Sequence, residues 1–499
     1  MANPLYDALF APHEASDRPF LILPDGRTIR HAAFLGQAER LARALRVAGL
    51  AAGDRMAIQM EKSPAMLALI AAAIRCGVVF LPLNTAYTPA EVDYFVRDSG
   101  ATLLVCDPAR AESLAGCAPR VLTLATDGTG SLARLDDGGA APVAARTGTD
   151  LAALLYTSGT TGRSKGAMLS QDNLLSNARV LVEAWRFTDR DVLLHALPVF
   201  HTHGLFVAVN VALLAGCPMI FLPRFDAPEV LRWLPEATTM MGVPTFYTRL
   251  LAEPGLDRAL VGHMRLFVSG SAPLLAETHR AWEARTGQRI LERYGMTETN
   301  MNTSNPYDGD RRAGTVGPAL PGVEVRVCDP AGQERPRGEP GMVEVRGPNV
   351  FLGYWGMPEK TRDELRPDGF FITGDLGVMD AEGYLTIVGR AKDLVISGGF
   401  NIYPKEVEEA LDSLPEVLES AVFGVPHADL GEAVVAAVVP APGVAPDPAA
   451  LLAALGPTLA RFKQPRRIVI LPELPRNAMG KVQKAALRQT FRDLFPAGS

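Results

Sequence analysis

The stretch Tyr156–Gly166, YTSGTTGRSKG, is dense in hydroxyl side chains and glycines, and its one lysine is Lys165. It follows the apolar run Leu151–Leu155, as a loop that leaves a buried strand would. Glycines let backbone N–H groups approach an anion, hydroxyls donate hydrogen bonds, and the lysine adds positive charge. The residue order of a Walker A loop is absent. We therefore expect a phosphate-binding loop of another kind; the alternative is a flexible surface turn. Its candidate nucleotide-binding residues are Thr157, Ser158, Gly159, Thr160, Thr161, Gly162 and Lys165.

Around this loop, helical and strand-like patterns alternate. Glu39–Val47 has apolar residues at helical spacing, whereas Arg55–Gln59 and Val78–Leu83 resemble strands. Such alternation predicts an α/β fold with a largely parallel sheet. From residue 314, short strands between Pro and Gly turns indicate a β-rich subdomain, and beyond residue 393 helices and strands mix again. We expect a large N-terminal domain, residues 1–391, of α/β subdomains with a β-rich subdomain, and a small, mobile α+β domain, residues 392–499.

Composition excludes several classes of protein. The chain has 499 residues, 48% of them hydrophobic and 21% charged, so two or more folded domains are expected. Its net charge of −6 argues against a general nucleic-acid binder. Five scattered cysteines suit a reducing compartment, and MANPLYDALF has no basic leader, so we expect a cytoplasmic protein. The run Leu205–Pro223 imitates a membrane span, but Asn210 and the break at residues 216–218 favour a buried helix, a turn and a strand.

The phosphate loop resembles that of the adenylate-forming superfamily, which includes acyl-CoA synthetases, luciferases and peptide-synthetase adenylation domains. The family often has proline where this chain has Ser164. Further motifs of the family follow in order over almost the whole chain. They are His201–Gly204 (HTHG), Tyr294–Glu298 (YGMTE), Thr373–Asp375 (TGD), Gly389–Arg390 and Pro475–Lys481 (PRNAMGK).

The resemblance implies an acid–thiol ligase that uses ATP, Mg²⁺ and coenzyme A. A carboxylate would attack the α-phosphate of ATP, and a thiol would then take the acyl group, so that positioning and charge neutralisation carry the catalysis. By resemblance, Glu298 binds magnesium and Thr297 lies beside the α-phosphate. Tyr294 and Gly295 would contact adenine, and Asp375, assisted by Arg390, the ribose. A turn-capping role is the alternative for Asp375.

The resemblance also implies two poses for the C-terminal domain. Lys481 would catalyse adenylation, although a lysine near a C-terminus is ordinarily inert surface. By resemblance, Lys392 would be the hinge, one of the few positions that absorb a large change in backbone angles. In the second pose Ser397, Gly398 and Gly399 would lie along coenzyme A; a simple β-hairpin is the alternative for this segment.

Two arginines bear on the choice of acid. By resemblance, His201 lies near the reacting carboxylate, whereas the neighbouring His203 is more simply structural. Arg249 and Arg293 could each grip a second carboxylate bidentately, or could reach solvent or a neighbouring acid. Ser271 is a weaker substrate-binding candidate. The sequence around Glu292–Glu298 resembles the malonyl-CoA synthetases, so we expect malonate as substrate and methylmalonate as a second one.

Three rival functions remain open at this stage. The chain could be a synthetase for another short- or medium-chain carboxylic acid. It could be a non-catalytic protein that keeps the nucleotide-binding fold, although Lys165, Glu298, Asp375 and Lys481 argue against that. It could also be an adenylation domain that loads a carrier protein. The expected partners are small molecules only, with neither nucleic acid nor membrane.

Overall fold

The computed structural model describes residues 2–157, 164–397, 400–427, 430–456, 458–477 and 481–495. Their contacts divide the chain into two compact units. The first unit comprises Met1–Leu274, Thr278–Val325 and Val345–Phe371, and the second Leu275–Glu277, Arg326–Glu344 and Ile372–Ser499. This division reflects packing, so the expected boundary between residues 391 and 392, which concerns motion, stays a prediction.

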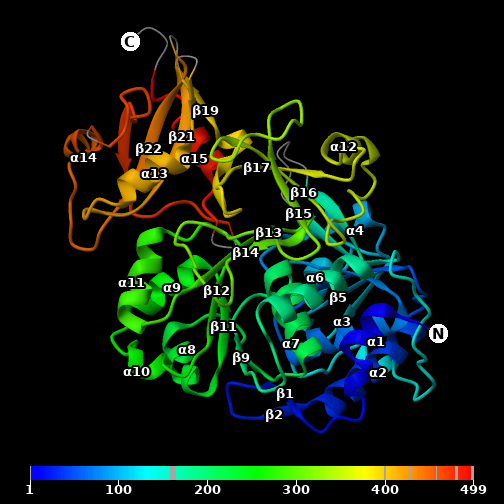
Figure 1. Cartoon of the computed structure of the whole chain (residues 1–499). Coiled ribbons are helices and arrows are strands. Elements are labelled where there is room, and N and C mark those ends of the chain that lie inside the picture. The colour runs from blue at the N-terminus through cyan, green and yellow to red at the C-terminus, as the bar shows by residue number, and fades with distance from the viewer. Residues whose placement is uncertain are drawn as a thin grey trace. The chain divides into compact units, whose positions relative to one another are not determined.

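A six-stranded sheet in the first unit carries the phosphate loop. Its order is β6-β5-β3-β4-β7-β8, parallel except for the hairpin of β7 and β8 (Figure 1). Alanines, valines and leucines of its strands pack against Val92, Phe95 and Val96 of helix α4. The strands are β3 (Arg55–Gln59), β4 (Val79–Pro82), β5 (Leu103–Cys106), β6 (Arg120–Thr123), β7 (Leu151–Thr157) and β8 (Lys165–Ser170).

An eight-stranded sheet of the same unit has the order β14-β13-β12-β11-β9-β10-β1-β2. Its inner strands are parallel, so their carboxyl ends meet along one edge, which is where α/β sheets bind ligands. The strands are β1 (Pro19–Ile22), β2 (Thr28–Arg30), β9 (Leu193–His195), β10 (Met219–Phe221), β11 (Thr239–Gly242), β12 (Leu266–Ser269), β13 (Leu291–Met296) and β14 (Asn300–Ser304).

Helices flank both sheets of the first unit (Figure 1). Several begin at side-chain caps, such as Thr88 and Ser170, each of which forms a reciprocal capping box. The α-helices that lie wholly or mostly in this unit are α1 (Pro4–Leu9), α2 (His31–Val47), α3 (Pro64–Cys76), α4 (Pro89–Ser99), α5 (Ala111–Leu114), α6 (Gln171–Ala184), α7 (Asn210–Ala215), α8 (Ala227–Trp233), α9 (Pro244–Ala252), α10 (Arg258–Val261), α11 (Ala276–Thr286) and α12 (Pro358–Glu364).

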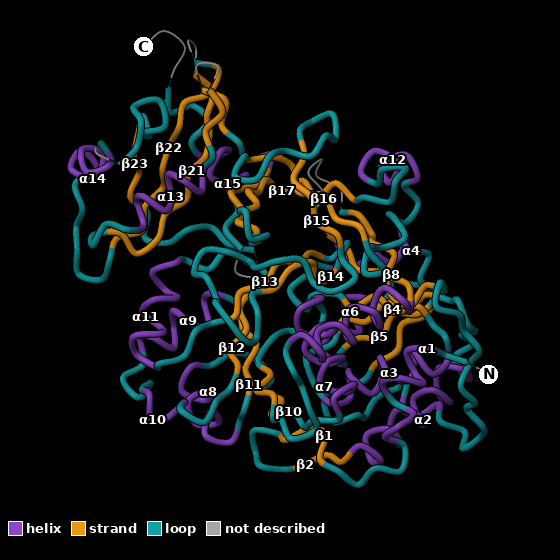
Figure 2. The backbone as a smooth tube through the Cα atoms, viewed as in Figure 1, coloured by secondary structure: helices purple, strands orange, loops and turns teal. Residues whose placement is uncertain are grey.

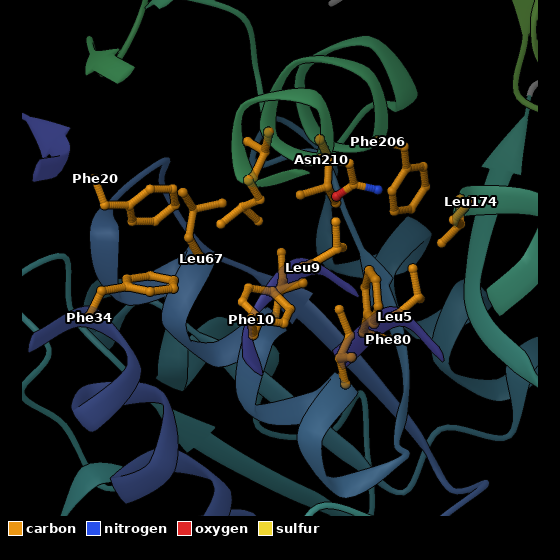
Figure 3. A pocket seen from close by; sticks show the side chains of 15 residues that line it. Leu5, Leu9, Phe10, Phe20, Phe34, Leu67, Phe80, Leu174, Phe206 and Asn210 are labelled. Atoms are coloured by element: carbon orange, nitrogen blue, oxygen red, sulfur yellow. The ribbon is translucent and has the colours of Figure 1, made fainter. Parts of the chain in front are cut away.

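The apolar run at residues 205–223 folds as expected into helix, turn and strand. A π-helix, His203–Val209, continues into α7, Gly216 ends the helix with a left-handed φ of 69°, and β10 follows. No helix in the described part of the chain is long and apolar enough to cross a membrane. The π-helix and α7 also border an apolar cavity of about 20 Å³, large enough for about one water molecule (Figure 3). None of the candidate site residues lines this cavity, so we treat it as a packing feature.

The second unit begins with most of a four-stranded sheet, β15-β16-β17-β18. Its strands are β15 (Glu324–Cys328), β16 (Pro340–Arg346), β17 (Phe371–Met379) and β18 (Leu385–Arg390). They confirm the expected β-rich subdomain. A single 3₁₀ turn, Ala391–Asp393, connects β18 to the rest of the unit.

A five-stranded sheet forms the C-terminal part of the second unit (Figure 2). Its two faces carry separate hydrophobic cores. Helices α13 and α14 contribute to one core, and Leu487 of α15 to the other. The elements are β19 (Val395–Ser397), β20 (Phe400–Ile402), β21 (Val417–His427), β22 (Gly431–Pro440), β23 (Arg467–Ile470), α13 (Pro404–Asp412), α14 (Pro448–Leu455) and α15 (Lys484–Thr490). The expected mixed α/β fold is confirmed.

Candidate active site

Lys165 anchors the first group of site residues. It opens β8, directly across from Thr157 at the end of β7. Only 9% of Lys165 is exposed, its Nζ lies 3.4 Å from Oε2 of Glu364, and the ammonium sits 4.0 Å from the ring centre of Tyr354. Ser158, Gly159, Thr160, Thr161 and Gly162 lie outside the described residues, so the loop itself stays a prediction.

Glu298 lies in the turn between β13 and β14 and is 5% exposed. Its Oε1 accepts hydrogen bonds from the Tyr354 hydroxyl at 3.0 Å and from Oγ1 of Thr157 at 3.4 Å. The structure thus brings Thr157, Lys165 and Glu298 together, although the sequence separates them widely. Thr297 is half-buried beside Glu298.

The donor set fits magnesium only in part. Mg²⁺ commonly uses one or two carboxylates and completes its shell with water and phosphate oxygens. Glu298 offers such a carboxylate, with Oγ1 of Thr157 beside it. No cluster of three or more potential metal ligands occurs among the described residues. A magnesium ion here would therefore depend on the phosphates of a nucleotide.

Tyr294 and Gly295 lie on β13 and are half-buried. A Cβ at residue 295 would lie 1.9 Å from the carbonyl oxygen of Asn300, so the close β13–β14 hairpin itself requires glycine there. Packing alone therefore explains Gly295, and the adenine contact of Tyr294 stays a prediction.

Arg293 lies on the same strand and is buried, with 3% of its surface exposed. Its Nε and Nη2 find no hydrogen-bond partner among the described residues. The guanidinium lies so close to Gly270 that a Cβ there would be 2.4 Å from Arg293 Cζ. Burial lowers the pKa of Arg293 to about 9, because charge is costly away from water. A buried cation with free donors is a strong candidate site for an anion.

Ser271, His203 and His201 form a connected group, and His203 feels the charge of Arg293. Ser271 follows Gly270, takes a left-handed φ of 70°, and places its Oγ 3.2 Å from Nδ1 of His203. His203 is buried, and its pKa lies well below the ordinary value, first through burial and then through the charge of Arg293. His201 is half-buried, and its Nδ1 accepts a weak hydrogen bond of 3.4 Å from the His203 backbone.

Arg249 lies elsewhere. It sits in the last turn of α9, whose buried face consists of Phe246, Tyr247 and Leu250, and it is exposed. Tyr247 donates a 2.6 Å hydrogen bond to the Val268 carbonyl and fixes that face against β12. Arg249 therefore does not share the environment of Arg293.

Asp375 and Arg390 form a pair in the second unit. They face each other across β17 and β18, and Nε of Arg390 lies 2.7 Å from Oδ1 of Asp375. The backbone N–H of Asp375 also donates to Oγ1 of Thr373 at 3.0 Å. This ion pair explains both residues structurally, so their expected contact with ribose stays a prediction.

Lys481 belongs to the same electrostatic cluster. Its carbonyl accepts a hydrogen bond of 2.9 Å from the backbone N–H of Asn477, and its backbone N–H donates to Oδ1 of Asn477 at 3.0 Å. Although the residue as a whole is exposed, the pKa of its amine is lowered to about 8 by partial burial and by the charge of Arg390, with Lys392 adding to the effect and Asp375 opposing it. Catalysis by Lys481 stays a prediction.

The expected hinge and coenzyme A segment lie in the same unit. Lys392 is an exposed residue in the 3₁₀ turn Ala391–Asp393. Ser397 ends β19, which forms a hairpin with β20, whereas Gly398 and Gly399 lie outside the described residues. The alternative, a hairpin, is present as the antiparallel pairing of β19 and β20. The roles of these residues stay predictions.

Sequence reasoning missed two sets of residues. Tyr354 and Glu364 contact the magnesium and phosphate candidates, although no local pattern marks them. Lys62 donates to Nδ1 of His195 at 2.8 Å, and Nε2 of His195 lies 2.8 Å from the Gly204 carbonyl. Since a carbonyl only accepts, Nε2 carries the proton and Nδ1 accepts from Lys62. These hydrogen bonds connect Lys62 through His195 to the backbone of Gly204, the last residue of the HTHG motif.

The chain belongs to the AMP-binding enzyme family. Residues 10–355 match the AMP-binding enzyme family, and residues 406–481 match the C-terminal domain of these enzymes. Together with the nature of its relatives, this match makes the protein an AMP-forming acyl-CoA synthetase that binds ATP and acts on small molecules. The expected superfamily and enzyme class are confirmed.

Three proteins illustrate how similar known relatives are to this chain. The crystal structure of ATP-bound MatB from Rhodopseudomonas palustris is 56% identical, with a TM-score of 0.97 over 99% of this chain and 100% of that one. A feruloyl-CoA synthase from Amycolatopsis sp is 37% identical over 495 residues, 98% of both chains. A malonate–CoA ligase from Arabidopsis thaliana is 34% identical over 482 residues, 88% of this chain and 78% of that one.

Proposed function

We propose that the protein is a malonyl-CoA synthetase that makes malonyl-CoA, AMP and pyrophosphate from malonate, ATP and coenzyme A. One carboxylate oxygen of malonate attacks the α-phosphorus of ATP, and pyrophosphate leaves. The thiol sulfur of coenzyme A then attacks the acyl carbon of malonyl-AMP, its proton goes to solvent, and AMP leaves. No protein nucleophile is needed, so the residues act by orientation and charge.

The single observation that carries this choice is the buried guanidinium of Arg293 with two donor nitrogens that lack partners among the described residues. A second carboxylate would satisfy both nitrogens in a bidentate contact. A fatty or aromatic acid would leave them unpaired, which costs binding energy. Arg249 is exposed, so we assign the distal carboxylate to Arg293.

The overall sequence identity to two of the relatives does not identify the carboxylic acid substrate. The malonate–CoA ligase at 34% identity and the feruloyl-CoA synthase at 37% differ in substrate but resemble this chain about equally. A pocket that holds one extra methyl discriminates by only about 1–3 kcal/mol, so methylmalonate is the expected second substrate. His203, which feels the charge of Arg293, and Ser271, which lies within hydrogen-bond distance of His203, are then also substrate neighbours.

Each unit contributes charged groups to the proposed chemistry. In the first unit, Lys165 and the loop before it would hold the phosphates, and Glu298 would hold magnesium. Bound there, magnesium would neutralise phosphate charge. In the second unit, Lys481 would neutralise the developing charge during adenylation, while Asp375 and Arg390 hold the ribose. Rotation about Lys392 would then bring the segment Ser397–Gly399 to coenzyme A.

Pyrophosphate release with a panel of acids tests the proposal. Malonate should be used most efficiently, methylmalonate next, and acetate and octanoate far less. Free coenzyme A should complete the reaction, whereas a carrier-protein loader would leave malonyl-AMP in place. Equal turnover of acetate and malonate would contradict the dicarboxylate assignment and favour a synthetase for another short- or medium-chain acid.

A further inference from the structure

Tyr354 bridges the two charged candidates of the first unit. Its hydroxyl lies 3.0 Å from Oε1 of Glu298 and 2.7 Å from Oε2 of Glu364. Glu364, the last residue of α12, is in turn 3.4 Å from Nζ of Lys165. One continuous chain of contacts thus joins the proposed magnesium ligand to the lysine of the phosphate loop.

We propose that Tyr354 is a positioning residue of adenylation, whose hydroxyl orients the carboxylate of Glu298 toward magnesium while Glu364 fixes the other side of the hydroxyl. This inference rests on the proposed role of Glu298 as magnesium ligand. It adds a requirement that the sequence motifs do not contain.

The phenol is held firmly enough to orient another group. The backbone N–H of Tyr354 donates to Oγ1 of Thr361 at 2.9 Å, and its ring packs on Phe351 with centroids 4.8 Å apart. Its backbone also forms a β-bridge with Ala167 on β8. The residue is therefore fixed at both its backbone and its ring.

The hydroxyl of Tyr354 acts as a hydrogen-bond donor. An ordinary phenol ionises only at about pH 10, so it is protonated at neutral pH. Burial would raise the pKa of Glu364, but hydrogen bonds from Lys360 and Tyr354 and the charge of Lys165 hold it below its ordinary value. Glu364 is therefore ionised at neutral pH.

One proton thus serves two carboxylates, because a phenol has one O–H and an ionised carboxylate only accepts. Without the hydroxyl, the two acidic groups would face each other directly, and like charges repel. The Glu298 carboxylate would then turn away or take another partner. The free energy lost would appear where Glu298 matters, in the binding of magnesium with the nucleotide.

Tyr354→Phe tests this role, since phenylalanine keeps the ring against Lys165 and Phe351 and removes only the hydroxyl. Tyr6→Phe is the matched control. Tyr6 lies on helix α1 and is as buried as Tyr354. Its hydroxyl donates to Glu14 at 2.7 Å, the same distance as from Tyr354 to Glu364. ATP affinity is measured by calorimetry without any acid, once with Mg²⁺ and once with EDTA. Binding needs no turnover, so the result does not depend on the identity of the acid.

The expected result is a loss of about tenfold in ATP affinity for Tyr354→Phe with Mg²⁺, because hydrogen bonds to charged groups are among the strong ones. In EDTA the affinity should equal that of the wild type, and Tyr6→Phe should lose stability but no affinity. Wild-type affinity with Mg²⁺, or an equal loss with and without Mg²⁺, would overturn the inference.

Glu364→Gln provides a second check, because glutamine still accepts the hydrogen bond from Tyr354. It should keep the wild-type gain in ATP affinity on adding Mg²⁺. If Glu364→Gln instead shows the magnesium-specific loss of Tyr354→Phe, charge on Glu364 orients the site and the inference about the hydroxyl is wrong. A wild-type protein that binds ATP with Mg²⁺ but does not activate malonate would refute the proposed function alone.

Discussion

Replacing Arg293 with methionine should separate stability from substrate choice, because the two effects have opposite signs. In the ligand-free protein the guanidinium is buried, and two of its nitrogens lack partners among the described residues. Burial lowers its pKa from the ordinary arginine value to about 9. At about 1.4 kcal/mol for each pKa unit, this shift corresponds to several kcal/mol against the charged form.

The sign of the pH dependence follows from that lowered pKa. The cost is fully present below pH 9 and fades as the pH rises from there toward the ordinary pKa of arginine. At pH 7 Arg293→Met should therefore stabilise the ligand-free protein. Methionine leaves part of the guanidinium volume empty, so we expect a net gain of about 1–3 kcal/mol rather than the full amount.

In contrast to the gain in stability, Arg293→Met should impair the activation of malonate. Removing one partner of a buried charge pair costs about 2–5 kcal/mol, so kcat/KM for malonate should fall roughly 30- to 5,000-fold. Acetate, which has no second carboxylate, should be used as before or better. The assays are pyrophosphate release with both acids and thermal unfolding with and without malonate.

Arg249→Met is the control. Arg249 is exposed on α9, so the same substitution should change stability by less than about 0.5 kcal/mol and leave the preference for malonate unchanged. If Arg293→Met kept that preference and Arg249→Met lost it, the assignment of the distal carboxylate would be refuted.

Three further predictions concern the second unit. Lys481→Ala should reduce malonyl-AMP formation at least 100-fold while largely sparing transfer from supplied malonyl-AMP; equal loss in single-turnover assays of both steps would contradict its role. Because the pKa of Lys481 is lowered to about 8, its charged form is lost as the pH rises through 8, and the adenylation rate should fall over the same range. An adenylation rate that does not change up to about pH 10 would argue against a charged amine. Lys392→Pro should slow thioester formation more than adenylation, since proline fixes φ at the hinge; equal slowing in stopped-flow assays would remove the hinge assignment.

Much of the fold was predictable because local pattern and burial agree. The expected helix Glu39–Val47 lies within α2, the expected strand Arg55–Gln59 coincides with β3, and the expected strand Val78–Leu83 contains β4. Apolar runs between turns mark such elements wherever both faces of a sheet are covered.

The site was less predictable, because its geometry depends on contacts across the chain. Strand alternation places the side chains of Arg293 and Tyr294 on opposite faces of β13, but it does not say which face is buried. The spacing of Phe246, Tyr247 and Leu250 does place Arg249 on the outer face of its helix, a signal that helical periodicity contains. The bond between Tyr354 and Glu298 joins residues 56 positions apart, and no local pattern encodes it.

A crystal structure with malonyl-AMP bound would test the central claim most directly. We predict that the distal carboxylate accepts hydrogen bonds from Nε and Nη2 of Arg293 at about 2.7–2.9 Å. A distal carboxylate held by other groups, with the Arg293 guanidinium still unpaired, would contradict the account and leave the protein an acyl-CoA synthetase for a different acid.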